Sequence, residues 1–286
     1  MQEISPHVYI DTSYAGVTLG AISGKHGLIM IDSPLRADDI RAWRAALLNL
    51  GGSAADRLLI NLDAHYDRTL GVRGMECTVV AHESTAEIFR NRPLLFKAQG
   101  FETGSEWEMY NGLGTIRWAA PDLSFTDVMH IHWDDQPVML EYHPGPASGS
   151  IWAVLPEAHV AFIGDTVMDG QPPFLAGADI PQWLETLNLL LSPEWAGYLL
   201  VSGRGGLVGP EEVREQIRQL EKIKAVLDRL AEIKSRPEDT HALVPELMNG
   251  HNYSDVLEAH YMQRLRWGLQ QYFARNYRRM NVEVDA

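Results

Sequence analysis

Polar side chains that could bind a metal ion or assist hydrolysis gather in one short segment, residues 58–71 (LLINLDAHYDRTLG). Asp63, His65 and Asp67 alternate there, and Arg68 follows directly. Carboxylate oxygen and imidazole nitrogen are ligands that zinc, iron and manganese accept. Arg68 cannot be a ligand, because a guanidinium has no lone pair to donate. The segment therefore combines three possible metal ligands with one permanent cation.

Three more residues of the same types follow predicted strands later in the chain. His143 follows PVMLEY, Asp165 ends HVAFIGD, and Arg204 lies in VSGRGG. If the fold brings them close to Asp63 and His65, these residues could form one of two kinds of site. One is a metal site built on carboxylates and imidazoles, and the other is a cluster in which arginines neutralise the carboxylates.

The elements that must position these residues alternate in type. Period-two patterns and β-branched residues predict strands, and 3.6-residue patterns predict helices. The predicted strands are 7–11, 16–23, 27–33, 57–63, 77–82, 114–120, 127–133, 137–143, 150–156, 159–165 and 197–203. The predicted helices are 37–50, closed by Gly51-Gly52, then one opened by Ser84 as N-cap with Glu87 in a capping box, and 180–191. This mixed order favours a layered α/β protein.

From about Pro210 the pattern becomes helical. Apolar residues from Val213 to Leu230 recur at the spacing of one helix face. A second long helix, residues 254–279 with Ser254 as N-cap, is rich in aromatic residues: Tyr261, Trp267, Tyr272, Phe273 and Tyr277. These aromatic side chains could pack on the preceding domain, form a lid over a ligand or form a seam between two copies of the chain.

Residues 58–71 resemble the metallo-β-lactamase signature, a hydrophobic strand followed by HxHxDH and a glycine. Residues 143–167 (HPGPASGSIWAVLPEAHVAFIGDTV) resemble the family segment PGHTxGSxxxxxPExxxxxxGDxx, and VSGRGGLVG resembles the family strand that ends in GHG. The resemblance covers roughly residues 7–209. It implies an α/β fold, the αββα metallo-β-lactamase sandwich, over residues 1–209. Residues 210–286 then form a helical C-terminal extension, packed on it or forming a dimer contact.

The family holds two metal ions, usually zinc, with seven ligand positions. The resemblance places three acceptable residues at their family positions: His65, Asp67 and the bridging Asp165. Asp63 stands at the first His and could still bind metal. Pro146, Arg68 and Arg204 stand at the third, fourth and last His and cannot.

The second metal pocket would thus contain Asp67 and Asp165 together with two arginines. A divalent ion would be strongly repelled there. We therefore expect Arg68 and Arg204 to replace the missing cation and to pair with these aspartates, with Asp32 ordering the loops beneath.

The first pocket leaves an alternative open. Asp63, His65 and Asp165, with His143 in reach, form a possible site for a single divalent metal: zinc, iron or manganese. The other reading is a polar cluster that needs no cofactor. By contrast, His130 and His132 are expected on an exposed strand face, and His82 is expected to be a hydrogen-bonded structural residue.

Three functions follow from these readings. The first is a metal-free pseudoenzyme or a protein that binds a small molecule, possibly an anion held by Arg68 and Arg204. The second is a mononuclear metal-dependent hydrolase of an ester, lactone or phosphoester, with Asp67 as general base and Arg68 or Arg204 stabilising the oxyanion. The third is a structural protein that forms homodimers through its C-terminal helices.

Bulk properties narrow the setting. The net charge of −14 argues against a nucleic-acid partner, which would need clustered Lys and Arg. The sequence shows no secretory signal and no apolar run of the length that spans a membrane, so we expect a cytoplasmic protein without a membrane partner. The single Cys77 excludes an intrachain disulfide.

Overall fold

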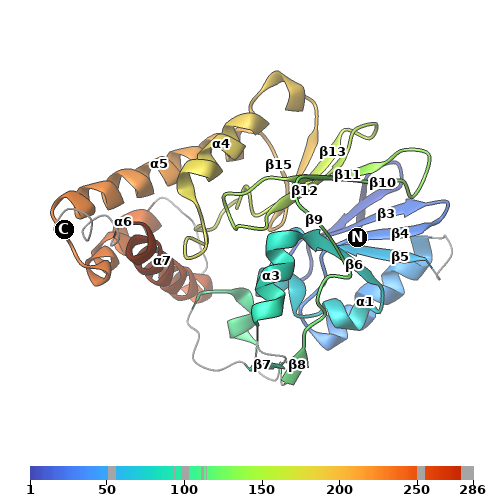
Figure 1. Ribbon diagram of the computed structural model, residues 1–286, viewed down its shortest axis with the longest axis horizontal. Helices are drawn as coiled ribbons and strands as arrows, with labels where there is room; N and C mark the ends of the chain where they lie inside the picture. The colour runs from blue at the N-terminus through green and yellow to red at the C-terminus, as the bar shows by residue number, and fades with distance from the viewer. Residues whose placement is uncertain are drawn as a thin grey trace.

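The computed structural model describes residues 1–50, 56–92, 95–97, 103–110, 113, 115–249 and 255–277. Within these ranges, two large β-sheets lie face to face, and helices lie along their outer sides (Figure 1). Gly51, Gly52 and Ser254, which were predicted to end one helix and begin another, fall outside the described residues.

The first sheet has the strand order β1-β2-β3-β4-β5-β6-β9. Its strands are β1 (Gln2–Ser5), β2 (Val8–Asp11), β3 (Leu19–Gly24), β4 (Gly27–Ile31), β5 (Arg57–Ile60), β6 (Thr78–His82) and β9 (Leu123–Phe125). β1 to β4 pair antiparallel, whereas β4, β5, β6 and β9 run parallel. Parallel strands end at the same edge, so the loops after β4, β5 and β6 lie together.

The second sheet has the order β10-β11-β12-β13-β14-β15. Its strands are β10 (Val128–Ile131), β11 (Val138–Tyr142), β12 (Ile151–Leu155), β13 (Val160–Gly164), β14 (Leu199–Ser202) and β15 (Gly206–Val208), and β7 (Leu95–Lys97) with β8 (Thr115–Arg117) forms a separate pair. β13 and β14 are parallel, with Gly164 opposite Ser202. The loops that carry Asp165 and Arg204 therefore leave the sheet side by side.

Three apolar layers hold the sandwich together, one between the sheets and one on the outer side of each sheet. Between the sheets, buried side chains from β4 and β5 meet those of β11 to β13, among them Ile29, Ile31, Ile60, Leu140, Ala153 and Phe162. On the outer side of the first sheet, α1 (Ala37–Leu47) inserts Trp43, which is completely buried. The short α2 (Tyr66–Thr69) and α3 (Glu83–Asn91) follow β5 and β6.

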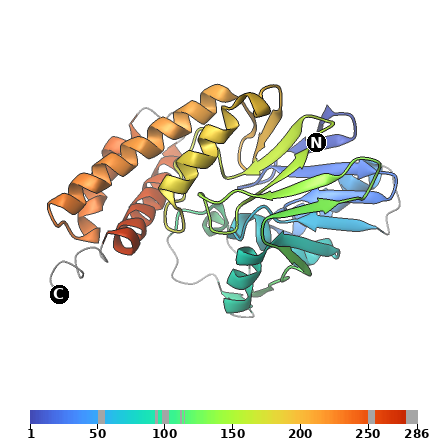
Figure 2. The ribbon, with the colours of Figure 1, turned by 45° about the horizontal axis from the view of Figure 1, so that its top comes forward.

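The outer side of the second sheet is covered by α4 (Ile180–Leu190) and by helices after residue 209 (Figure 2). These helices are α5 (Pro210–Glu232), α6 (Val244–Met248) and α7 (Asp255–Asn276), and the 3₁₀ turn η5 (Pro237–Leu243) connects α5 to α6. Earlier in the chain, the 3₁₀ turns are η1 (Leu48–Leu50), η2 (Val72–Met75), η3 (Glu106–Met109) and η4 (Pro193–Trp195). The predicted face of α5 is buried at Val213, Leu220 and Leu227 in the core that also holds Trp152 of β12. The helical extension and the sandwich share this core.

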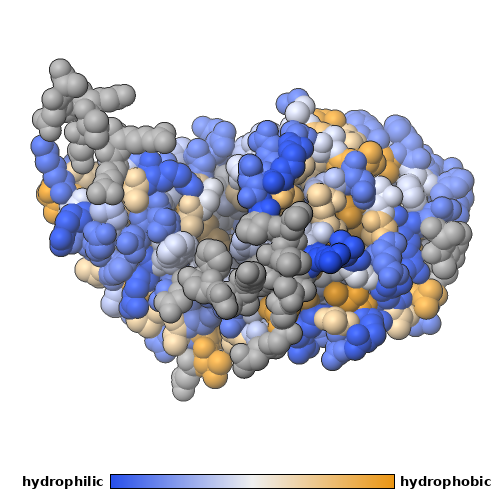
Figure 3. Space-filling view, turned by 60° about the horizontal axis from the view of Figure 1, so that its bottom comes forward, coloured by the Kyte–Doolittle hydropathy of each residue, from blue (hydrophilic) through white to orange (hydrophobic). Residues whose placement is uncertain are grey.

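The aromatic residues of α7 pack inward. Tyr261, Tyr272 and Phe273 are buried in the same core as α4 and α5. This supports the packing alternative for that helix, whereas a dimer and the boundary at residue 209 stay predictions. The face of the molecule in Figure 3 carries small hydrophobic patches separated by hydrophilic residues.

The structure corrects two local predictions. Ser84 is not the N-cap of α3, because the helix begins at Glu83 and the Nδ1 atom of His82 accepts the Ser84 N–H at 3.1 Å. The first helix ends as an α-helix at Leu47, and residues 48–50 continue it as a 3₁₀ turn. The strands β1, β7, β9 and β15, each of three or four residues, were not predicted. None of the described helices is long and apolar enough to cross a membrane.

Candidate functional site

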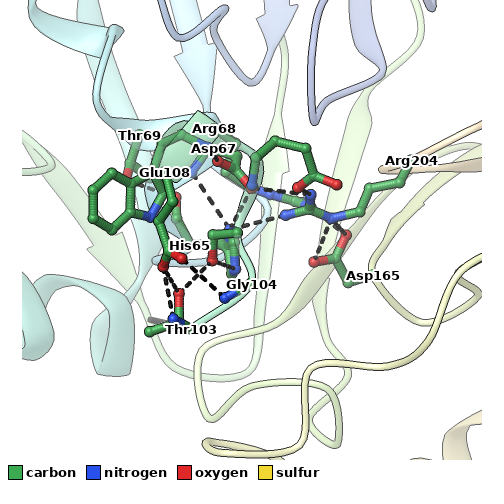
Figure 4. A network of polar contacts seen from close by, with 12 residues as sticks. His65, Asp67, Arg68, Thr69, Thr103, Gly104, Glu108, Asp165 and Arg204 are labelled. Carbon is green, nitrogen blue, oxygen red and sulfur yellow. Dashed lines mark hydrogen bonds and ion pairs between the residues drawn. The ribbon is translucent and has the colours of Figure 1, made fainter. Parts of the chain in front are cut away.

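The predicted site residues meet at one edge of the sandwich. Asp63 and His65 follow β5, Asp67 and Arg68 lie in α2, and Asp165 follows β13. Arg204 reaches them from the turn between β14 and β15, and Figure 4 shows its guanidinium between His65 and Asp67 on one side and Asp165 on the other. The segments that resemble the family signature therefore converge, as predicted.

Arg204 is the hub of this group and is 2% exposed. Its Nε atom donates to both carboxylate oxygens of Asp165 at 3.2 Å. Its Nη1 atom donates to Asp67 Oδ2 at 3.0 Å and to Glu106 Oε2 at 2.7 Å. Its Nη2 atom lies 2.8 Å from His65 Nδ1. All three nitrogens of the side chain are therefore engaged.

Arg68 is fully buried and binds a second set of carboxylates. Its Nη2 atom donates to Asp165 Oδ1, its Nη1 atom lies 3.3 Å from Asp32 Oδ2, and its Nε atom lies 3.3 Å from Asp63 Oδ1. Gly203 makes room for this side chain, because a Cβ there would come within 2.9 Å of both Nη atoms. The predicted pairing of both arginines with Asp165 is present, and Asp67 pairs with Arg204 alone.

Two members of the cluster were not predicted from the sequence. Glu106, in the 3₁₀ turn η3, bridges Arg204 to Arg264 of α7, whose Nη2 atom donates to Glu106 Oε1 at 2.9 Å. Arg264 also donates to the carbonyl of Gly104 at 2.8 Å and stacks on Phe174 at 3.9 Å. In the sequence, Arg264 lies between Tyr261 and Trp267 of the last helix. A charged residue within this aromatic stripe is the signal from which its burial could have been predicted. The C-terminal extension is thereby tied to the cluster.

Burial and neighbouring charges divide the carboxylates into two groups. Burial raises the pKa of Asp67 to about 8, with the charge of Glu106 adding to the effect, and burial raises the pKa of Asp32 to about 7. For Asp165, burial opposes ionisation, but Arg204 and Arg68 outweigh it and hold the pKa well below its usual range. Arg204 and Arg264 do the same for the pKa of Glu106. Asp165 and Glu106 are thus the firmly ionised members.

His65 is held neutral with a defined tautomer. Its Nδ1 atom faces two donors, Arg204 Nη2 at 2.8 Å and the backbone N–H of Asp67 at 3.4 Å, so the ring proton must lie on Nε2. Burial, followed by the charge of Arg204, lowers the pKa of His65 well below its ordinary value. Phe174 packs against the ring with centroids 4.3 Å apart.

A cavity of about 300 Å³ opens in front of this cluster. Asp63, His65 and Asp165 line it, together with Pro146 and, from α7, Trp267. Most of its other lining residues are apolar: Ala64, Ile88, Ala147, Met168, Phe174, Leu175, Ala176 and Trp183. The cavity is therefore a mainly apolar space with a carboxylate-bearing end, closed on one side by the C-terminal extension.

The residues predicted to act in catalysis do not face this cavity. Asp67, Arg68 and Arg204 are absent from its lining and are at most 2% exposed. Asp67 accepts the Trp107 N–H at 2.8 Å and the Glu106 N–H at 3.3 Å, in addition to Arg204. This placement argues against Asp67 as a general base and against the arginines as oxyanion donors, since none of the three can touch a ligand in the cavity.

The other histidines lie elsewhere. His143, the fourth candidate metal ligand, stacks on Trp152 at 3.6 Å, and its Nε2 atom lies 3.0 Å from Glu141 Oε2. It does not join the cluster, which corrects its proposed place beside Asp63. His130 and His132 are exposed, as expected. His82 is a structural residue, also as expected: its Nε2 atom bonds the Thr126 carbonyl at 2.7 Å, and its ring stacks on Tyr142.

Comparison with solved structures identifies the architecture. A metallo-β-lactamase from Pontibacter korlensis superposes with a TM-score of 0.60 at 18% identity, covering 77% of this chain and 97% of that chain. A metallo-β-lactamase family protein from Thermus thermophilus gives 0.62 at 17% identity, covering 98% of this chain and 95% of the other. The chain has the metallo-β-lactamase fold. No protein-family model and no curated protein matches its sequence.

A larger metallo-β-lactamase-fold neighbour is the stereoselective inverting sec-alkylsulfatase from Pseudomonas sp.. It superposes with a TM-score of 0.63 at 15% identity, covering 96% of this chain, which spans 49% of the sulfatase. At these identities the likeness shows the fold alone.

The residues at the family's metal positions do not fit two metal ions. Arginine nitrogens bond the carboxylates of Asp67 and Asp165 and the Nδ1 atom of His65, which are the atoms that would face a metal. Among the residues that the structure describes, no three His, Cys, Asp or Glu side chains are grouped as a metal site requires. The guanidiniums of Arg68 and Arg204 supply the positive charge in this part of the fold.

Proposed function

We propose that this protein is a metal-independent, small-molecule-binding protein in which an arginine–carboxylate cluster replaces the metal centre of the metallo-β-lactamase fold. The observation that carries the proposal is the geometry of Arg204. Its three nitrogens bond Asp165, Asp67, Glu106 and His65, so the atoms that would hold a metal already have partners.

The cavity supports a binding role. Its volume of about 300 Å³ lies at the lower end of the range for small-molecule sites, and its lining is mainly apolar with a few polar groups. The cluster behind it fixes the orientation of Asp63, His65 and Asp165. A buried network of charge-assisted hydrogen bonds holds its members in place, which keeps the wall of a binding site in one shape.

The arginines favour a structural role over anion binding. Arg68 and Arg204 make ion pairs to four aspartates, Asp32, Asp63, Asp67 and Asp165, and Arg204 to Glu106. Neither side chain lines the cavity. A small anion would have to displace a buried carboxylate to reach them, which leaves that carboxylate without its partner at a high cost.

The experiment that tests this proposal is elemental analysis of protein purified without chelator from cells supplied with zinc, iron and manganese. We expect no stoichiometric metal in the wild-type chain or in His65→Ala. The matched control is His82→Ala, which removes a structural histidine outside the cluster. About one tightly held ion per chain, lost in His65→Ala and kept in His82→Ala, would support the mononuclear hydrolase instead and refute the proposal.

A restored site provides the complementary test. Changing Asp63, Arg68, Pro146 and Arg204 together to His returns the family's ligand types. Pro146 and Asp63 line the same cavity, so histidines there would face the same space. We expect about two zinc ions per chain in this variant, as in a dinuclear centre of this fold. Retention of a metal-free state would mean that the backbone, and not the replaced side chains, excludes metal.

A further inference from the structure

A directed chain of hydrogen bonds ends at the cavity wall. Thr103 Oγ1 donates to Glu108 Oε1, which uses the only hydrogen of that hydroxyl. In the 2.9 Å contact between Thr103 Oγ1 and Ser105 Oγ, the hydrogen must therefore come from Ser105. Thr103 and Ser105 both line the cavity, and with their hydrogens used in this chain they can only accept from a ligand.

His65 is the donor beside these acceptors. Its Nδ1 atom accepts from Arg204, so Nε2 carries the ring proton and points away from Arg204. In Figure 4, His65 lies between Arg204 and Thr103. Its Nε2 atom lies 3.5 Å from Ser105 Oγ, well beyond the usual N–H···O distance of about 2.9–3.0 Å. The described residues therefore use this N–H only weakly.

His65 and Ser105 do not form a base and a nucleophile. A serine nucleophile needs a neighbouring imidazole nitrogen that can take its proton. The Nε2 atom already carries a proton, because Nδ1 is the atom that accepts from Arg204. The hydrogen of Ser105 also lies toward Thr103 and not toward His65. The pair is therefore suited to binding a ligand and not to attacking one.

The charged side chains of the cavity wall have little to offer an ionised ligand. Both carboxylate oxygens of Asp165 accept from Arg204 Nε at 3.2 Å. Arg264 donates from its Nε atom and both Nη atoms to acceptors outside the cavity lining. Arg92 stacks on Tyr66 at 4.4 Å, its Nη2 atom donates to a backbone carbonyl, and its Nη1 atom is buried. An ionised ligand would thus lose its water without reaching an unpaired group of opposite charge.

We propose that the cavity binds an uncharged alcohol, a hydroxyl group on an apolar body. The hydroxyl accepts the N–H of His65 Nε2 and donates its own hydrogen to Ser105 Oγ, so one group satisfies both. A ketone can use only the N–H, and an ammonium can use only the acceptor. The apolar body lies among wall residues such as Ala147, Met168 and Trp183. The inference rests on the proposed metal-independent binding function and names the chemical class of its ligand.

A hydroxyl also suits the carboxyl group of Asp63 at this end of the cavity. Asp63 lines the cavity, and its Oδ1 atom accepts the His65 backbone N–H at 2.7 Å. A hydroxyl can donate to an ionised carboxyl group and accept from a protonated one, so its fit holds for either state of Asp63. An ammonium ligand would need the ionised form, and a carboxylate ligand would need the protonated form.

The test is a ligand-observed NMR titration of the purified, metal-analysed full chain with four compounds that share one apolar ring. These are cyclohexanol, cyclohexanone, cyclohexylammonium and cyclohexanecarboxylate. We expect cyclohexanol to bind about fivefold more tightly than cyclohexanone, the ratio that one neutral hydrogen bond supplies, and at least about tenfold more tightly than either ion. Equal or tighter binding of the ketone or of either ion, or no binding of the alcohol, overturns the proposal.

Ser105→Ala makes the test specific to the acceptor. We expect the affinity for cyclohexanol to fall about fivefold, whereas that for cyclohexanone does not fall, because the ketone uses His65 alone. The matched control is Ser124→Ala, which removes an equal hydroxyl that bonds Glu83 outside the cavity lining and should change neither affinity. An equal loss for alcohol and ketone in Ser105→Ala is what a general disturbance of the cavity would produce, and it would overturn the proposal.

Gly177→Leu tests the cavity without touching the cluster. Gly177 lines the cavity, and a Cβ there would meet no atom within 4 Å, so leucine fills the space at little structural cost. We expect it to abolish cyclohexanol binding with an unchanged Tm; unchanged binding would place the ligand elsewhere and overturn the proposal. Stoichiometric metal in the same protein would refute the proposed function, whereas a metal-free protein that prefers the ketone or an ion would refute only the ligand class.

Discussion

Behind the cavity wall, Arg204 has three nitrogens on four partners, while at the wall itself the Nε2 atom of His65 has one long contact, 3.5 Å from Ser105 Oγ. Both positions belong to the segments that resemble a metal-binding signature, yet one is saturated and the other is not. The difference shows on which side of the cavity wall the arginines and the carboxylates of the cluster lie. Arg68 and Arg204 lie outside the cavity lining, whereas Asp63 and Asp165, which they pair with, belong to it.

The largest effect on stability is expected from Arg204→Met, which removes the central residue of the cluster. This leaves Asp67, Asp165 and Glu106 buried without a shared cation, and we expect the free energy of unfolding in urea to fall by about 3–5 kcal/mol. Arg218→Met is the control, because Arg218 pairs with exposed glutamates of α5 among the described residues, and its loss should cost at most about 1 kcal/mol. Equal costs in the two variants would contradict a structural role for Arg204.

A smaller effect is expected from Gly203→Ala, which crowds the cluster without changing its charge. The new Cβ would lie 2.9 Å from two nitrogens of Arg68 and 3.0 Å from Asp165 Oδ1. We expect a loss of about 1–3 kcal/mol in the free energy of unfolding, the usual cost of overpacking. Gly177→Ala serves as control, since a Cβ there meets nothing within 4 Å. A neutral result at Gly203 would show that Arg68 can move.

The pH dependence of stability distinguishes the carboxyl groups with raised pKa values from those with lowered pKa values. Burial raises the pKa of Asp67 to about 8 and that of Asp32 to about 7 in the folded protein. A carboxyl group whose folded pKa is raised contributes stability that is complete below its unfolded pKa of about 4 and is lost as pH rises through the folded value. We therefore expect the free energy of unfolding to decrease between about pH 5 and pH 8.

The low-pKa carboxylates do not cancel this trend. Asp165 and Glu106 have lowered pKa values, so their contribution is present above about pH 4 and is lost only in stronger acid. Urea titrations at several pH values measure the slope, and Asp67→Asn should reduce it. Stability that rises from pH 5 to pH 8 would contradict the assignment of protons to Asp67 and Asp32.

Much of the fold could be predicted from the sequence because its signals are local. The strands β5 and β13 show apolar runs, and polar residues of the site follow each of them. The meeting of Asp63, His65, Asp67, Arg68, Asp165 and Arg204 followed from the resemblance of their segments to one signature. His143 was misplaced, because its ring turns to Trp152 and Glu141, and alternation along β11 gives no information on rotamers.

The sequence alone determined that arginines, which cannot bind a metal, stand where the signature that these segments resemble has histidines, since residue identity decides whether an atom can donate a lone pair. Only the tertiary structure decided which charges face the cavity. Glu106 and Arg264 enter the cluster from segments about 40 and 200 residues beyond Asp67, and no local pattern reports such a contact. Burial then sets which carboxylates stay ionised, because desolvation depends on the whole surrounding fold and not on neighbouring residues in the chain.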